Sequence, residues 1–359
     1  MRTFVLALTL AVSMGPSPSW AGDAPDPVMS AYSYFEDARP ELQQPAIELL
    51  IERGDVARLA EARRAHGDDW TADSPTRVAY DGVAYGIDVA RRYAAAEAGS
   101  VSRWMILDEL MRSAWRAHVG AVLRRAGLTA LEAARVLAER AQAELACQEC
   151  FATAARDERT QELAVADALR RGNAIVPHAL AILAISPWIA FAGWPEGPTV
   201  LRQRLATRIL SGAKATVAVP YLLVHVDAPS AMLQFDVLRA LSELTADGTW
   251  GAKDLDPADL ASRRLGWWKL HGKGHADGAR WFALSGLAIA TNYLAWAELT
   301  SKPAATSGDE SPEPVAHLLG CVEWLTGYTV PRYRSESPDS AFGRGHYVAV
   351  AIRHFQGLE

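Results

Sequence analysis

The stretch of sequence that decides the fold is residues 219–245, VPYLLVHVDAPSAMLQFDVLRALSELT. It opens with a short apolar run, Pro220 to Val226, which the turn Asp227-Ala228-Pro229 ends. Beyond the turn, apolar side chains recur at every third residue, an interval typical of one face of a helix. These side chains are Met232, Phe235, Leu238, Leu241 and Leu244. The stretch therefore predicts two helices joined by a tight turn.

Helical patterns continue on both sides of this pair, and the alternation typical of strands is rare. Ser74-Pro75 is a typical helix start, and Thr129 and Glu132 have the spacing of a capping box. A stripe at helical spacing also predicts one long amphipathic helix that Gly127 ends. Its members are Trp104, Leu107, Met111, Trp115, His118 and Val122. We therefore predict an all-α fold.

The sequence from Val219 to Lys273 resembles a HEAT-like repeat of bacterial cell-envelope proteins. Its helix, Asp/Pro turn and second helix are followed by Trp250-Gly251 and by Asp256-Pro257, which starts a helix ending in Trp267-Trp268. The resemblance covers about residues 219–273, with a partial echo near 315–330 in Val322-Glu323-Trp324-Leu325-Thr326-Gly327. It implies packed antiparallel helix pairs in an α-solenoid-like arrangement, regular or irregular, with one pair around residues 213–270. It also implies a scaffold that binds a partner along an extended surface.

The chain divides into four segments by composition. Residues 1–21 have the features of a secretory signal peptide, because Arg2 precedes an apolar run and Ser19-Trp20-Ala21 places small residues at the cleavage positions. A helical domain over residues 22–299, a linker over 300–314 and a helical tail over 315–359 follow. We expect a periplasmic protein, with secretion as the alternative.

Charge and hydropathy limit the partners that the protein could have. The net charge of −6 does not favour nucleic acid, since binding phosphates needs a basic surface. Ala174 to Trp194 lacks formal charges and is long enough to cross a bilayer, but Pro177, His178 and Pro187 interrupt it. We interpret it as a buried pair of helices, which makes membrane association unexpected, with a membrane span as the alternative.

Three cysteines are too few for a disulfide scaffold. Cys147 and Cys150 form a C-x-x-C motif inside a helical pattern, and Cys321 lies far along the chain. A redox motif would follow a strand and open a helix, which this one does not. A structural disulfide and simple burial of the thiols both remain open, and at least one thiol must stay unpaired within the chain.

Two groups of residues are candidates for binding. His271, His275 and Asp277 could bring two imidazoles and a carboxylate to one metal ion. The alternative is a solvated turn, because Gly272 and Gly274 favour a loop. In a loop, the His-x-x-x-His spacing does not place the two imidazoles on one side. Tryptophans form the second group, since indoles anchor protein partners or stack on sugars. Trp250, Trp267 and Trp268 are the candidates, and the adjacent pair cannot share one helix face.

These features favour a binding function over catalysis. No hydrolase, zinc-protease or phosphate-binding motif occurs in the sequence, and we expect no cofactor. The expected partner is another exported or cell-envelope protein, and inhibition of an envelope toxin is one form that this could take. The alternative is an α-helical hydrolase or lyase in which tryptophans stack on envelope polysaccharide and carboxylates transfer protons.

Overall fold

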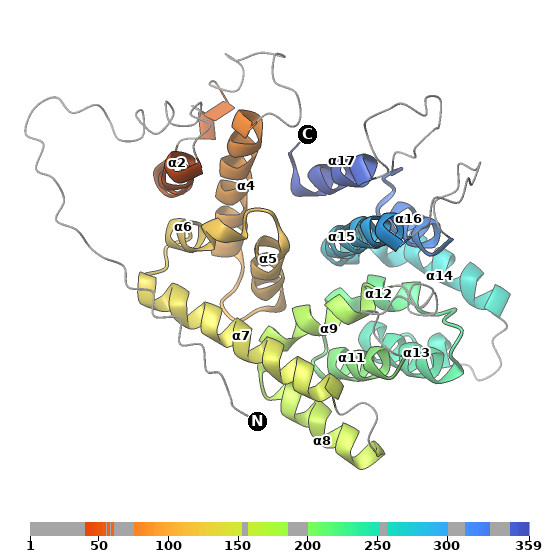
Figure 1. Cartoon of the computed structure of the whole chain (residues 1–359). Coiled ribbons are helices and arrows are strands. Elements are labelled where there is room, and N and C mark those ends of the chain that lie inside the picture. The colour runs from red at the N-terminus through yellow and green to blue at the C-terminus, as the bar shows by residue number, and fades with distance from the viewer. Residues whose placement is uncertain are drawn as a thin grey trace, which may run out of the picture.

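The structure is a computed structural model that describes residues 40–54, 56–57, 59–60, 75–152, 157–185, 200–251, 257–300, 313–330 and 345–358. In these residues the regular secondary structure is helical, which confirms the all-α prediction (Figure 1). The predicted signal peptide and most of the predicted linker lie outside the described residues. The α-helices are α2 Pro40–Arg53, α4 Pro75–Ala95, α5 Val101–Arg112, α6 Val119–Arg125, α7 Ala130–Ala152, α8 Glu158–Leu169, α9 Val176–Leu183, α11 Val200–Gly212, α12 Val219–Val224, α13 Ala231–Thr245, α14 Pro257–His271, α15 Ala276–Thr300, α16 Glu313–Thr326 and α17 Gly345–Gln356. Short 3-10 helices are η2 Arg116–His118, η3 Gly172–Ile175, η4 Thr216–Ala218, η5 Gly248–Gly251 and η6 Gly272–His275.

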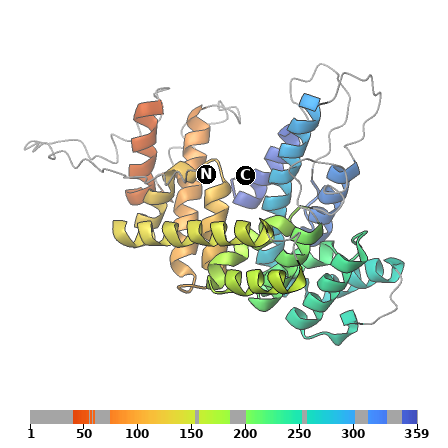
Figure 2. The same ribbon diagram turned by 60° about the horizontal axis from the view of Figure 1, so that its bottom comes forward.

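The helices pack in three neighbouring groups around one continuous core. In the first group α2 packs against α4 and α6, and in the second α11 packs against α8, α9 and α13. In the third group α15 packs against α16 and α17. The long helix α7 connects the first two groups, contacting α6 at one end and α8 at the other (Figures 1 and 2). The buried apolar side chains of all three groups belong to one cluster.

A recurring junction explains several glycines and prolines of the sequence. At four places in the described residues a 3-10 helix runs directly into an α-helix: η2 into α6, η3 into α9, η4 into α12 and η6 into α15. Pro177 and Pro220 occupy the first turn of α9 and α12, where the missing N–H has no helical partner to lose. Gly272 and Gly274 belong to η6, so the segment His271 to His275 is a compact helical turn.

The long helix predicted from Trp104 to Val122 is wrong, because it breaks in the middle. α5 ends at Arg112, and the Ser113 hydroxyl donates to the Leu110 carbonyl at 2.7 Å, which satisfies an acceptor at the end of the helix. The chain then turns through η2 and resumes as α6. Gly127 ends this helix as predicted, with φ +91°.

The uncharged segment from Ala174 is divided among short elements in the part of it that is described. η3 and α9 account for Gly172 to Leu183, and α9 is only eight residues long. The rest of the segment, through Trp194, lies outside the described residues. Among the helices of the described part of the chain, none has both the length and the apolar character needed to span a bilayer.

A buried carboxylate holds the N-terminal and C-terminal groups of helices together. Glu109 of α5, whose side chain is only 3% exposed, accepts paired hydrogen bonds from Arg92 of α4 at 2.9 and 3.0 Å. It accepts a second pair from Arg280 of α15, both at 2.8 Å. The Tyr85 hydroxyl and the Trp281 indole each donate at 3.1 Å, so each carboxylate oxygen accepts three hydrogen bonds. These hydrogen bonds offset the free-energy cost of burying the Glu109 charge.

The C-terminal helix α17 is tied to the same region by further arginine contacts. Arg280 donates its Nε to the backbone carbonyl of Phe355 at 2.8 Å. Arg353 of α17 forms an ion pair at 2.6 Å with Asp81 of α4, whose side chain is 2% exposed. Residues that are more than 250 positions apart in the sequence therefore form one packed unit.

One glycine permits the close approach of α15 to the η4–α12 junction. A Cβ on Gly278 would lie 2.7 Å from the carbonyl oxygen of Val217 and 3.1 Å from Pro220 Cγ. We expect Gly278→Ala to lower the free energy of unfolding by about 1–3 kcal/mol, since backbone cannot rotate away as a side chain can. Gly266, in the middle of α14, has open space around its Cβ position, so Gly266→Ala should instead stabilise by up to about 1 kcal/mol. Urea unfolding measures the change in the free energy of unfolding for each variant. Equal changes in Gly278→Ala and Gly266→Ala would contradict the close packing at Gly278.

Candidate functional site

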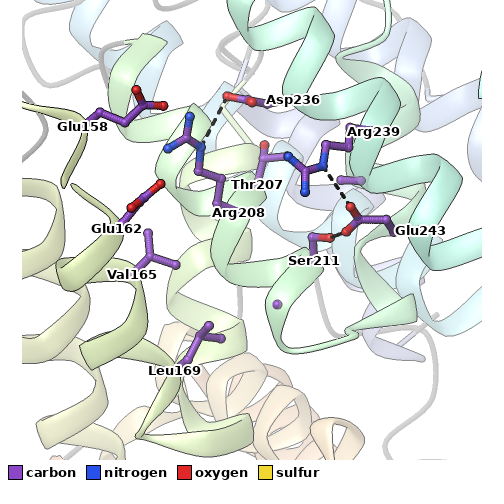
Figure 3. A pocket seen from close by; sticks show the side chains of 12 residues that line it. Glu158, Glu162, Val165, Leu169, Thr207, Arg208, Ser211, Asp236, Arg239 and Glu243 are labelled. Carbon is purple, nitrogen blue, oxygen red and sulfur yellow. Dashed lines mark hydrogen bonds and ion pairs between the residues drawn. The ribbon is translucent and has the colours of Figure 1, made fainter. Parts of the chain in front are cut away.

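Helices α8, α11 and α13 lie side by side and enclose an open groove of about 380 Å³ (Figure 3). This volume is near the lower end of the range for ligand sites and has room for a few side chains. Most of the groove lining is polar or charged, with four carboxylates and two guanidinium groups. Its lining residues are Glu158, Glu162, Val165, Leu169, Thr207, Arg208, Ser211, Gly212, Asp236, Arg239, Ala240 and Glu243.

Local sequence features fix the three walls of the groove. α8 begins after Asp157, whose side chain accepts a hydrogen bond from the Thr160 N–H at 3.0 Å, a typical N-cap. Gly212 lets α8 approach α11 closely, because a Cβ there would lie 2.8 Å from Leu169 Cδ1. On α13, Leu233 and Leu241 are buried, and Asp236 and Arg239 between them line the groove.

The carboxylate of Asp236 is compensated by two arginines of α11. Arg204 Nε donates to it at 2.6 Å, and Arg208 lies 3.7 Å away from the same oxygen. The side chain of Asp236 is only 8% exposed. Arg204 also donates towards the sulfur of Met232 at 3.7 Å. This ion-pair network therefore joins α11 to α13.

A second carboxylate, Glu243, is held in its ionised form. It accepts a hydrogen bond from the Ser211 hydroxyl and another from Arg239 Nε at 2.9 Å. The hydrogen bond from Ser211, followed by that from Arg239, lowers the pKa of Glu243 below its usual value. A general acid needs the opposite shift, so Glu243 is suited to binding or structure and not to proton donation.

The two remaining carboxylates give the groove its net negative charge. Glu158 and Glu162 are one helical turn apart on α8, and both side chains point towards the groove opposite Arg208 (Figure 3). Both residues are exposed, and no hydrogen bond or ion pair with another described residue engages them. They are therefore available to a cationic group from outside the chain.

The tryptophans proposed as binding residues lie elsewhere and contact other aromatic rings. Trp250 is fully buried and meets Trp267 edge-on with ring centres 6.2 Å apart. Trp268 donates its indole N–H to the Leu325 carbonyl at 3.1 Å and packs edge-on against Trp324 at 6.1 Å. Trp267 and Trp268 thus face different neighbours, η5 and η6 for the first and α16 for the second, and both are half-buried.

The three residues proposed for a metal site lie in three successive elements. His271 ends α14, His275 ends η6, and Asp277 is exposed in the first turn of α15. Both imidazoles lie against the indole of Trp267, with ring centres 4.8 and 5.6 Å from it. Burial lowers the pKa of His275. Among the described residues, no group of three or more His, Cys, Asp or Glu side chains is placed to hold a metal ion.

All three cysteines are buried thiols, and none is in a disulfide. Burial raises the pKa of the Cys147 thiol far above its usual value, and it raises the pKa of both Cys150 and Cys321 to about 11. Because the thiolate is the reactive form of cysteine, a raised pKa lowers the reactivity of these thiols near neutral pH. Of the two possibilities left open for Cys147 and Cys150, simple burial is the one observed.

The groove carboxylates were not among the residues singled out from the sequence. The segment Asp157-Glu158-Arg159-Thr160-Gln161-Glu162 does carry a signal, an N-cap followed by two glutamates one turn apart. That pattern is also common on solvated helix faces, and only the position of α11 and α13 makes it part of a site.

Comparison with models of protein families, with curated proteins and with solved structures gives no match for this chain.

Proposed function

We propose that this chain is an exported protein of the cell envelope that binds another exported or envelope protein and has no chemistry of its own. The groove between α8, α11 and α13 is the proposed binding surface. The observation that carries the proposal is the pair Glu158 and Glu162, two exposed carboxylates one turn apart beside a cavity of about 380 Å³. Electrostatic complementarity of this kind selects a partner surface that presents lysine or arginine.

The state of the other groove carboxylates supports binding over catalysis. Asp236 is compensated by Arg204 and Arg208, and Glu243 by Ser211 and Arg239. These contacts stiffen the two walls contributed by α11 and α13, leaving the α8 wall to recognise the partner. A rigid site loses less conformational freedom on binding, which favours affinity. Inhibition or control of an envelope toxin is one role that such a surface could serve.

A polysaccharide hydrolase or lyase is the rival function, and the groove gives it less support. That function calls for aromatic platforms next to a carboxylate of raised pKa. Within the described part of the chain, the groove lining includes no tryptophan, and the pKa of Glu243 is lowered. Turnover of envelope polysaccharide by the purified protein, lost in Glu162→Gln, would favour the rival.

Affinity capture from envelope extract tests the proposal when it is paired with variants of the chain. We expect a specific protein to be retained by the native chain and lost with Glu158→Lys/Glu162→Lys, because like charges at an interface cost several kcal/mol. Glu97→Lys, which changes an exposed carboxylate on the α4–α5 turn, is the matched control and should retain the partner. Quantitative mass spectrometry provides the comparison. Equal recovery with all three baits would contradict the proposal.

A further inference from the structure

The outward face of α14 combines exposed leucines with lysines. Leu265 is 47% exposed and Leu270 is 80% exposed, although both are large apolar side chains. Lys269 lies between them in the sequence, and both Lys269 and Lys273, which belongs to η6, are exposed. The opposite side of α14 packs inward through Leu260 and the two tryptophans. α14 therefore presents an uncovered apolar and cationic face, formed by Leu265, Lys269, Leu270 and Lys273.

The groove presents the complementary combination of charge and apolar surface. Met232 and Phe235 on α13 are 59% and 65% exposed, and Met232 precedes the groove-lining residue Asp236 by one turn of that helix. Glu158 and Glu162 form the acidic wall opposite. The two carboxylates are four residues apart on their helix, and Lys269 and Lys273 are separated by the same number of residues. Glu158 and Glu162 are one α-helical turn apart on α8, whereas Lys273 lies in η6 beyond the end of α14, so the two pairs match in charge.

We infer that the α14 face of one copy of this chain docks on the α8–α11–α13 groove of a second copy. Lys269 and Lys273 of one copy would pair with Glu158 and Glu162 of the other, and the exposed leucines would cover Met232 and Phe235. This inference rests on the proposed function, because it assigns to the binding groove an occupant that imitates a basic protein partner.

The position of the two surfaces makes this contact heterologous. The groove is formed by α8, α11 and α13 and the other surface by α14 and η6, so the contact joins two different surfaces of the chain. A head-to-tail contact leaves one α14 face and one groove unused at the ends of each pair. Association therefore continues into a ring or an open chain of copies. Self-association would also compete with partner binding for the groove.

Sedimentation equilibrium of the native chain and two charge-reversed variants tests the inference. We expect the native chain to associate, and the Kd to rise by roughly tenfold or more in either Lys269→Glu/Lys273→Glu or Glu158→Lys/Glu162→Lys. An equimolar mixture of the two variants should associate again, because the acidic groove of one variant meets the basic α14 face of the other, and the reversed groove meets the reversed α14 face in the same way. The variant with all four reversals should associate again through swapped charges.

Controls separate this inference from the proposed function. Glu97→Lys should associate like the native chain, and circular dichroism verifies that each variant folds. Glu158→Gln/Glu162→Gln, which keeps the side-chain shape, should also weaken association. A native chain that stays monomeric to roughly 1 mM, or association that neither reversal changes, would overturn the inference. A groove that captures a different protein while the chain stays monomeric would leave the proposed function standing.

Discussion

Glu109→Gln should lower the free energy of unfolding by about 3–5 kcal/mol, the cost of removing one partner from a buried ionic network. The native carboxylate accepts six hydrogen bonds, four of them from the guanidinium groups of Arg92 and Arg280. The amide that replaces it carries no charge, so both arginines would lose their buried anionic partner. Guanidinium chloride unfolding followed by circular dichroism measures the change.

Glu139→Gln is the matched control for this prediction. Glu139 pairs with Arg135 on the exposed surface of α7 at 3.2 Å, and such a pair contributes about 0.5 kcal/mol or less to the free energy of unfolding.

The pH dependence of unfolding provides a second test of the role of Glu109. Burial by itself raises the pKa of Glu109, but the hydrogen bonds from Arg92 and Arg280 outweigh burial and lower it to about 2. The stabilisation is therefore present above the unfolded pKa of about 4.5 and lost as the pH falls towards 2. If the free energies of unfolding of the native chain and of Glu109→Gln differ by the same amount from pH 6 to pH 2, this role of Glu109 is contradicted.

Phe282→Ala should also cost about 3–5 kcal/mol, because it empties a closed part of the core. Phe282 of α15 is fully buried and meets the ring of Tyr221 on α12 edge-on at 5.2 Å. The variant loses the apolar burial, the aromatic contact and the packing of both helices around the cavity. Chemical unfolding at a protein concentration low enough to prevent association measures the loss.

Phe235→Ala makes the same substitution on the surface. Phe235 is 65% exposed on α13, so its replacement should change the free energy of unfolding by about 0.5 kcal/mol or less. The two phenylalanine variants thus separate core packing from docking, since Phe235 is assigned to the self-association surface. Comparable destabilisation by both variants would contradict the core described for α12 and α15.

The local elements of the fold were predictable because their signals are local. The capping box at Thr129 is present as expected, with the Thr129 N–H donating to Glu132 at 2.8 Å. α4 begins at Pro75, and α12 and α13 flank the Asp/Pro turn. Ser113 shows the limit of such patterns, since the apolar stripe continues past this residue although its backbone is extended and α5 has ended. Periodicity records which side chains face inward but not whether the backbone between them remains one helix.

The contacts between distant segments were not predictable from the sequence. Glu109 and Arg280 are 171 residues apart, and neither belongs to a motif. Met232 and Phe235 have helical spacing with Leu238 and Leu241, yet they are exposed and Leu233 and Val237 are buried in their place. A helix with apolar side chains on more than one face does not specify which face turns inward. The groove is missed for the same reason, because its three walls come from α8, α11 and α13.

The binding role of the groove can be tested most directly by photo-crosslinking inside the cell. A photoreactive residue in place of Val165 would lie in the groove wall, and one in place of Leu131, which is 81% exposed on α7, serves as the reference. We expect a discrete crosslinked protein from position 165 that disappears when Glu158 and Glu162 are changed to lysine. Crosslinks from position 131 alone, or a position 165 adduct that survives the charge reversal, would contradict this role.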